Sequence, residues 1–236
     1  AAKTAMAIPA KSAYLEIRIA IPLFPERLRP TMTAHPYSSP DDVVSEADRY
    51  RNAERAATCD GGFWVFGYGS LMWDPGFAHV ERREALLHGF ARRFCMWSVH
   101  YRGTPEDPGL VLALLEEAGA ATEGVAYRVS AAQAPDALGY LQERELVSSA
   151  YRETTAEIVF GDERVRSIAY VMNTAHPQFA GGLTLDDQAE VIERAIGPRG
   201  RNCEYLFNTV AHLQEIGVQD LELERLAQLV RERRRT

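Results

Sequence analysis

The order in which strand-like and helix-like segments follow one another is the strongest restriction on how this 236-residue chain can fold. Runs rich in β-branched and aromatic residues succeed one another from Gly61 to Val171, interrupted by one helical pattern that Ser130 caps and that continues to about Ser148. The other helical patterns come afterwards. Because a doubly wound sheet needs strands and helices in alternation, this order favours a mixed or antiparallel α+β domain.

The expected strands are short and closely spaced. The first is Phe63–Phe66, and it ends in a glycine-rich turn. Further strands are predicted at Glu81–Leu87, Ala91–Val99, Leu110–Glu116, Thr122–Arg128, Thr154–Phe160 and Arg164–Val171. Late helices are predicted at Leu185–Ile196 and Arg201–Ile216, each followed by a glycine, and from Asp220 onward.

The first 31 residues differ in composition from the rest. Both lysines of the chain lie within the first eleven residues, and from Met32 onward arginine is the only strong base. We therefore expect residues 1–60 to form an N-terminal extension, partly disordered or helical, with a short helical pattern at Pro40–Ala57. Met32 is then the natural start, or the segment before it is a transit-type peptide. Residues 61–236 are expected to form one folded domain.

Composition excludes several classes of function. The net charge of −7 argues against nucleic acid or an anionic membrane as the main partner, because either needs a basic face. No stretch reaches the ~18 apolar residues of a membrane span. Cys59, Cys95 and Cys203 form no CxxC pair or disulfide framework, which indicates a reducing, cytoplasmic compartment. The domain lacks a lysine for a Schiff base or a phosphate loop, and its histidines are too scattered for a metal site.

The turn Gly67-Tyr68-Gly69-Ser70 after the first strand is a candidate binding loop. Glycine permits backbone conformations closed to other residues, and successive N–H groups in such a turn can receive a carboxylate. Met72 breaks both the G-x-G-x-x-G and the G-x-S-x-G pattern, which argues against a dinucleotide site and a serine nucleophile elbow. A purely structural turn fits the same residues equally well.

Glu145 is the candidate acid–base group. Its spacing from Leu138 and Leu141 places it on the apolar stripe of the predicted helix, where burial raises the pKa of a carboxyl group. Such a group can act as a general acid or base near neutral pH. Glu143 and Arg144 are expected to turn to other faces. The alternative is that the three residues form a solvated charge run.

Two residues that follow the third predicted strand, Ala91–Val99, could contact a ligand. Arg102 could pair with a substrate carboxylate, although a structural ion pair fits it as well. His100 is more typical of a packed or surface histidine than of a catalyst.

Five ordered blocks resemble the ChaC-like γ-glutamylcyclotransferases. The blocks are Val65–Trp73, then Tyr101–Pro105 with Pro108–Val111, Glu123–Val129, Arg144-Glu145 followed by Tyr151, and Gly197–Leu206. The resemblance covers roughly Phe63 to Leu226. Two departures stand out: Ser149-Ala150 replaces the family's usual Gly-Gly pair, and Arg199 stands where serine is common.

The resemblance implies a mixed sheet that closes into a small β-barrel with flanking helices. It also implies release of 5-oxoproline from a γ-glutamyl compound, glutathione first among them, with Glu145 as general acid and base and without metal or cofactor. The expected substrate-binding residues are Val65, Phe66, Gly67, Tyr68, Gly69, Ser70, Tyr151 and Arg102. Alternatives are another γ-glutamyl amine or dipeptide as substrate, or a non-catalytic binding protein, since part of this family carries a cation-transport label.

Overall fold

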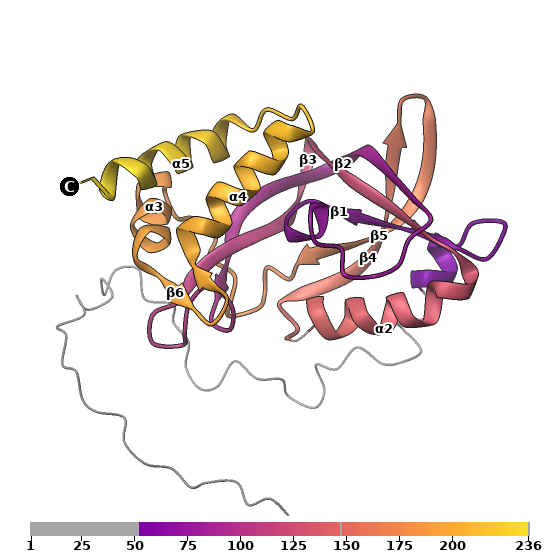
Figure 1. Ribbon diagram of the computed structural model, residues 1–236, viewed down its shortest axis with the longest axis horizontal. Helices are drawn as coiled ribbons and strands as arrows, with labels where there is room; N and C mark the ends of the chain where they lie inside the picture. The colour runs from indigo at the N-terminus through magenta and orange to yellow at the C-terminus, as the bar shows by residue number, and fades with distance from the viewer. Residues whose placement is uncertain (1–51, 147, 236) are drawn as a thin grey trace, which may run out of the picture.

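A closed five-stranded barrel forms the centre of the domain in the computed structural model, which describes residues 52–146 and 148–235 (Figure 1). The barrel order is β1-β3-β2-β4-β5, and β5 returns to pair with β1 in parallel. The strands are β1 (Phe63–Gly67), β2 (Glu81–Ser98), β3 (Gly109–Val129), β4 (Tyr151–Phe160) and β5 (Glu163–Met172). The predicted α+β class and the closed barrel are confirmed.

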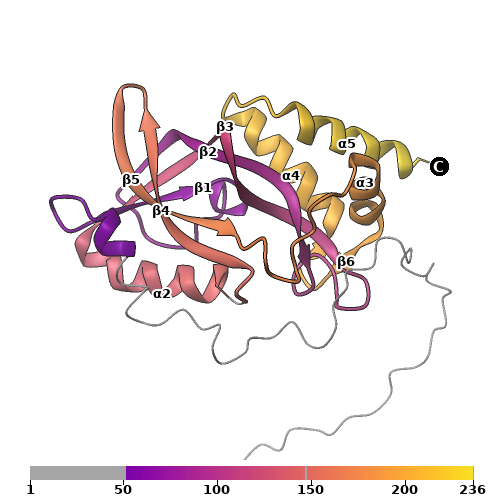
Figure 2. The same cartoon turned by 180° about the vertical axis from the view of Figure 1, so that it is seen from behind.

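Helices flank the barrel on two sides. The helices are α2 (Ala134–Glu145), α3 (Leu185–Arg194), α4 (Asn202–Glu215) and α5 (Leu221–Arg233). Two short 3₁₀ turns accompany them: η3 (Ser70–Met72) lies between β1 and β2, and η4 (Ala131–Gln133) lies directly before α2. Helix α2 lies along one side of the barrel, whereas α3, α4 and α5 form a layer at the other end of the molecule (Figures 1 and 2). A two-residue hairpin, β6 (Ile196–Gly197) with β7 (Gly200–Arg201), joins α3 to α4.

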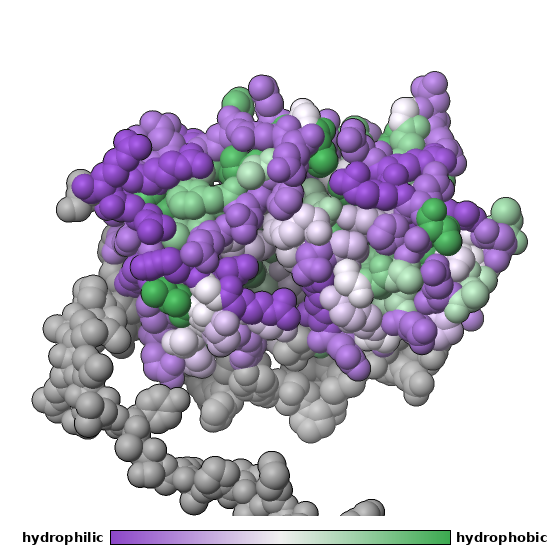
Figure 3. Space-filling model, in the orientation of Figure 1, coloured by the Kyte–Doolittle hydropathy of each residue, from purple (hydrophilic) through white to green (hydrophobic). Residues whose placement is uncertain are grey.

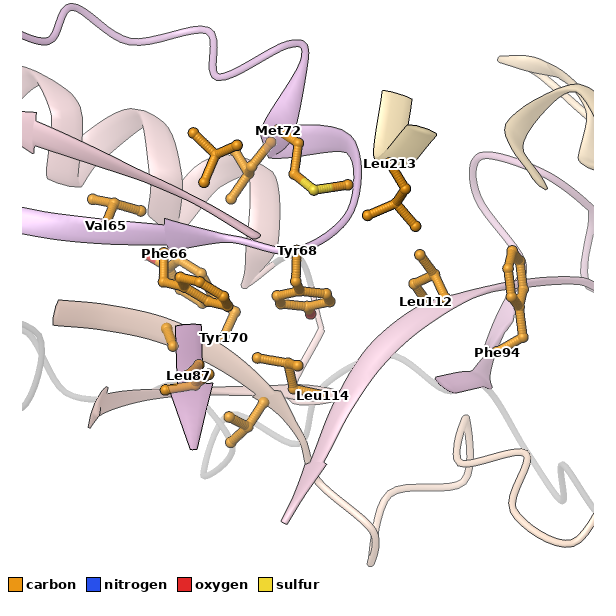
Figure 4. Close-up of a cluster of buried hydrophobic side chains, with 14 of the residues drawn as sticks. Val65, Phe66, Tyr68, Met72, Leu87, Phe94, Leu112, Leu114, Tyr170 and Leu213 are labelled. Carbon is orange, nitrogen blue, oxygen red and sulfur yellow. The ribbon is translucent and has the colours of Figure 1, made fainter. Parts of the chain in front are cut away.

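Strand β1 is the most buried strand of the barrel. It pairs antiparallel with β3 and parallel with β5, and all five of its residues are buried. A strand that is buried on both faces has a continuous apolar sequence instead of an alternating one, and Phe63–Phe66 is such a sequence. Figure 4 shows Val65 and Phe66 among the buried hydrophobic side chains of the core.

Strands β2 and β3 correct the sequence-based expectation. Each was expected as two short strands, but each is continuous, and the pair runs from Glu81 opposite Arg128 to Ser98 opposite Gly109. Gly89, which has a φ of +81°, lies at the first register shift instead of ending the strand. A glycine with positive φ suits a β-bulge as well as a turn.

Helix α2 also differs from its predicted bounds. It begins at Ala134 after a 3₁₀ turn, and it ends at Glu145 with Leu146 as its C-cap, whereas a helix from Ser130 to about Ser148 was expected. The Ser130 hydroxyl donates to the Gln133 side chain instead of capping the helix. Glu145 therefore lies at the helix terminus, where the chain turns toward β4.

The late helices follow their predicted signals closely. Asp220 caps α5 by accepting a hydrogen bond from the Leu223 amide at 3.1 Å. Gly217, with a φ of +76°, follows α4 as expected of a glycine stop. Helix α3 ends at Arg194, two residues early, because Ile196 already belongs to β6.

The predicted helical pattern at Pro40–Ala57 lies outside the described residues up to residue 51. Residues 52–56 are helical, and Ala57 forms an isolated bridge with Phe63. The face in Figure 3 is largely hydrophilic, with hydrophobic residues scattered across it. In the portion that the structure describes, no helix has the length and apolar character to cross a membrane.

Candidate active site

A cavity of about 130 Å³ opens beside the end of helix α2. Its wall includes Ser70 from the turn after β1, Glu145 from the last residue of α2, Tyr151 from the first residue of β4, and Tyr205 from α4. The same four residues line a smaller adjoining space of about 30 Å³, together with Tyr68 and Gly69. The fold thus brings the predicted loop and the predicted carboxylate to one place.

The glycine loop is shaped by close contacts. A Cβ at Gly67 would lie 3.0 Å from the Cβ of Leu71, and a Cβ at Gly69 would lie 3.2 Å from the Tyr205 hydroxyl. Neither glycine has a positive φ. They are therefore needed because the chain passes close to its neighbours, and not because of a left-handed backbone.

Backbone hydrogen bonds close the turn that follows the loop. The Met72 amide donates to the Gly69 carbonyl at 2.9 Å, and the Asp74 amide donates to the Ser70 carbonyl at 2.9 Å. The amides of Gly69, Ser70 and Leu71 donate to no acceptor within the described part of the chain.

Arg92 fixes the other side of the loop. Its Nη1 donates to the Tyr68 carbonyl at 3.1 Å and to the Glu123 carbonyl at 2.9 Å, and its Nε pairs with Asp220 at 3.3 Å. The Arg92 side chain is buried. No local pattern pointed to it, because its partners lie between 24 and 128 residues away.

Glu145 is enclosed at the inner end of the cavity. Its side chain is 15% exposed, and its Oε1 lies 3.1 Å from the Arg144 Nε. Burial raises the pKa of this carboxyl above its ordinary value, while the charges of Arg144 and Arg199 oppose the rise. The predicted burial of this carboxyl is confirmed, and its raised pKa suits proton exchange near neutral pH.

Arg144 contradicts the expectation that it turns away from the site. Its side chain is 12% exposed, and its Nη2 donates to the Ser70 hydroxyl oxygen at 2.9 Å. Its Nη1 donates to the Asp74 carbonyl at 2.6 Å. The alternative of a solvated charge run is therefore wrong, since only Glu143 of the three residues is exposed. The helix ends here, so the Arg144 side chain reaches the loop after β1.

Two tyrosines complete the inner wall. The Tyr151 hydroxyl donates to the Leu112 carbonyl at 2.6 Å, and the Leu112 backbone hydrogen-bonds the Tyr205 hydroxyl. Burial raises the pKa of Tyr151 well above its usual value and that of Tyr205 to about 12. Both are therefore neutral hydrogen-bonding groups at physiological pH. Tyr205 lies in the late sequence block, which was the one signal that could have drawn attention to it.

The remaining predicted residues fall into two groups. Val65 and Phe66 are fully buried in the core, and with Gly67 they lie outside the lining of the cavity. Arg102 lines the cavity, and its Nη1 donates to the Arg199 carbonyl at 2.6 Å and to the Arg201 carbonyl at 3.3 Å. It therefore holds backbone in place instead of forming a structural ion pair with a carboxylate of the described residues, and its pairing with a substrate carboxylate stays a prediction.

His100 also lines the cavity, and partial burial lowers the pKa of its imidazole. Over residues 52–146 and 148–235, no three His, Cys, Asp or Glu side chains are grouped as metal ligands would be. The polar side chains of the cavity include one carboxyl, three arginines, the His100 imidazole, the Gln178 carboxamide and several hydroxyls, which suit a ligand that carries carboxylates and an amine.

Comparisons with known proteins agree with this picture. The family model described as "ChaC-like protein" matches residues 63–233. A glutathione-specific γ-glutamylcyclotransferase of Escherichia coli (strain K12) is 37% identical over 176 residues, which are 72% of this chain and 75% of that protein. The glutathione-specific γ-glutamylcyclotransferase 1 of Homo sapiens is 37% identical over 172 residues, covering 71% of this chain and 76% of that protein.

A solved structure shares the fold. The crystal structure of a yeast γ-glutamyl cyclotransferase specific to glutathione aligns with a TM-score of 0.66 and 27% identity. The alignment covers 73% of this chain and 99% of the yeast chain.

Proposed function

The chain belongs to the ChaC-like family, and on this basis we propose that it is a γ-glutamylcyclotransferase that cleaves glutathione into 5-oxoproline and the dipeptide Cys-Gly. One observation supports the proposal most strongly. A buried carboxyl with a raised pKa, Glu145, lines the same cavity as Ser70 of the glycine loop. Three free cysteines fit the reducing cytoplasm as the place of this activity.

The reaction is an intramolecular displacement. The α-amine of the γ-glutamyl group attacks its own γ-carbonyl carbon, so a carbon–nitrogen bond forms and closes a five-membered lactam. The amide bond to cysteine breaks, and its nitrogen leaves as the amine of Cys-Gly. In our proposal Glu145 takes the proton from the attacking amine and gives a proton to the leaving nitrogen. The same group serves as base and then as acid, and the atoms balance without a further reactant.

The loop would hold the γ-glutamyl group. The amides of Gly69, Ser70 and Leu71 are available for an oxygen of the substrate. Arg144 donates to Ser70 Oγ, and a guanidinium has no acceptor, so the Ser70 hydroxyl proton is left to donate elsewhere. We assign that proton to the α-carboxylate of the substrate, which it would help to hold, or to the γ-carbonyl oxygen, where it would stabilise the negative charge that develops during attack.

Positioning accounts for much of the expected rate. A well-oriented intramolecular reaction can save about 7–11 kcal/mol of the barrier. One positioned acid–base group typically adds a factor of about 10²–10⁴. The loop and Arg144 supply the first effect in our proposal, and Glu145 supplies the second.

The test replaces Glu145 with glutamine. We expect Glu145→Gln to lower 5-oxoproline release from glutathione by about 10²–10⁴-fold, because the amide cannot exchange the proton. Release is measured by mass spectrometry, and circular dichroism checks that the fold is retained. Glu143→Gln is the matched control, since Glu143 is exposed two residues away on the same helix and should turn over normally.

Substrate choice is tested in the same assay. Glutathione, γ-glutamylcysteine and γ-glutamylalanine are compared with the unmodified protein, and glutathione should give the highest kcat/KM. Near-normal turnover by Glu145→Gln would contradict the assigned role. Absence of 5-oxoproline with every substrate would contradict the activity itself and favour a binding protein.

A further inference from the structure

We infer that Arg199 binds the terminal carboxylate of the leaving group, so that the site selects γ-glutamyl peptides whose leaving portion is a dipeptide with a free carboxylate. This inference rests on the proposed function and extends it to the opposite end of the substrate.

Arg199 lies at the tip of the hairpin between α3 and α4. Ile196 pairs with Arg201 and Gly197 pairs with Gly200, which leaves Pro198 and Arg199 at the turn. Arg199 lines the same cavity as Glu145. It is exposed, whereas Glu145 is largely enclosed, so the two residues mark the mouth and the inner end of the cavity.

The backbone of Arg199 is held on both sides. Its amide donates to the Tyr101 carbonyl at 3.0 Å, and its carbonyl accepts from Arg102 Nη1 at 2.6 Å. The hairpin lies so close to this segment that a Cβ at Gly197 would be 2.3 Å from the Tyr101 carbonyl oxygen. A ligand group held by a preorganised backbone costs less conformational entropy on binding.

The guanidinium of Arg199 is oriented by an aromatic ring. It lies over the Tyr101 ring, 4.7 Å from the ring centre. A stacked guanidinium uses its face for the ring and keeps its N–H edges for a planar partner such as a carboxylate. None of the carboxylates in the described segments forms an ion pair with Arg199.

The other arginines of the cavity are already engaged. Arg144 contacts Glu145 and Ser70, and Arg102 donates to the carbonyls of Arg199 and Arg201. Arg199 is therefore the cation best placed for an additional negative charge.

The substrate carries a second carboxylate that Arg199 could bind. Glutathione carries one carboxylate on its γ-glutamyl group and a second on glycine, at the far end of the leaving dipeptide. Two extended residues span at most about 7 Å, so the second carboxylate lies that far from the amide that breaks. With the γ-glutamyl group at Ser70 and Glu145, the dipeptide would run along Met96 and Val111 toward the mouth.

The experiment compares two substrates in four proteins. The substrates are glutathione and its glycinamide form, in which the terminal carboxylate is a carboxamide. The proteins are wild type, Arg199→Gln and Arg199→Lys, with Arg166→Gln as a control because Arg166 is exposed on β5 and outside the cavity. Rates of 5-oxoproline release give kcat and KM for each pair.

We expect Arg199→Gln to lower kcat/KM for glutathione about tenfold, because a charge-assisted hydrogen bond to the carboxylate is lost. The loss should appear in KM with kcat nearly unchanged, as for binding that is equal in ground and transition states. The preference of wild type for glutathione over the glycinamide should disappear in Arg199→Gln and return in part in Arg199→Lys. Arg166→Gln should behave as wild type.

Two results separate the inference from the proposed function. If wild type releases 5-oxoproline but Arg199→Gln changes both substrates equally, or neither, the inference is wrong and the proposed function stands. A purely structural role of Arg199 predicts that equal change, because it does not depend on the terminal carboxylate. If wild type releases no 5-oxoproline from either substrate, the proposed function fails and the inference fails with it.

Discussion

Glu145 and Arg144 are neighbours in sequence, and each sets the electrostatic environment of the other. Burial favours the neutral carboxyl and raises its pKa, whereas the Arg144 guanidinium at 3.1 Å favours the carboxylate. Because the base must be ionised before it can accept the proton of the amine, the rate should rise with pH through the pKa of Glu145. The position of that rise therefore reports the balance between burial and ion pairing.

Arg144→Gln should shift this balance in one direction. Removing the positive charge leaves burial less opposed, so the pKa of Glu145 rises further and the acidic limb of the kcat/KM profile moves to higher pH. The rate at the plateau should fall too, because Ser70 loses the donor that orients its hydroxyl. Initial rates measured from pH 5 to pH 9 would show both effects.

Arg144→Lys is the control for charge alone. It keeps the positive charge but lacks the planar fork that reaches both Glu145 and Ser70, so the limb should stay close to that of wild type while the plateau falls. An acidic limb that does not move in Arg144→Gln would show that Glu145 is not the group titrating in this profile.

Sequence spacing identified the Glu145 carboxylate but not the arginines that organise the site around it. The stripe through Leu138 and Leu141 correctly placed Glu145 toward the interior, because helical periodicity is a local property. Arg144 and Arg92 escaped notice because their partners come from distant segments. Ser70 lies 74 residues from Arg144, and such contacts are set by the packing of elements instead of by local spacing.

Among the elements, the loop between β1 and η3 has a shape that depends on a missing side chain. A methyl group at Gly69 would meet the Tyr205 hydroxyl at 3.2 Å, so either the loop or the tyrosine must move by a few tenths of an ångström. Gly69→Ala should therefore lower kcat by about 10-fold or more, since displacements of about 1 Å cost up to 10²-fold. The protein should remain folded, which thermal unfolding would check.

Gly139→Ala provides the comparison within the neighbouring helix. Gly139 is exposed in α2, and a Cβ there meets no atom within 4 Å. Alanine is favoured over glycine in a helix, so this variant should gain about 0.5–1 kcal/mol of stability and keep full activity. Equal activity of Gly69→Ala and Gly139→Ala would contradict the tight fit assigned to the loop.

Element types were predictable from the sequence, but their continuity was not. Gly89 and Gly119 fall where the strand patterns break, and both have positive φ. A turn and a bulge need the same backbone at such a residue, so composition cannot separate them. The pairing of β2 with β3 on both sides of Gly89 decides for a bulge within one long strand.

At the scale of the whole molecule, the site lies between two parts of the fold. One wall comes from the barrel and α2, which carry Ser70, Glu145 and Tyr151, and the other comes from α4 and the hairpin before it, which carry Tyr205 and Arg199. The cavity therefore keeps its shape only if α4 stays fixed against the barrel. This dependence explains why the site could not be assembled from sequence patterns taken one at a time.

Asn202 of α4 joins these two parts of the fold through hydrogen bonds to the barrel. Its side-chain oxygen accepts from the Leu110 amide at 2.7 Å, and its side-chain nitrogen donates to the Leu110 carbonyl at 2.7 Å, in a fully buried position. Asn202→Ala leaves two buried backbone groups without partners, so we expect a loss of about 2–4 kcal/mol in the free energy of unfolding. Chemical denaturation would measure it, with Asn208→Ala, exposed on the same helix, expected within about 0.5 kcal/mol of wild type. Equal stability of the two variants would mean that other contacts hold α4 against the barrel.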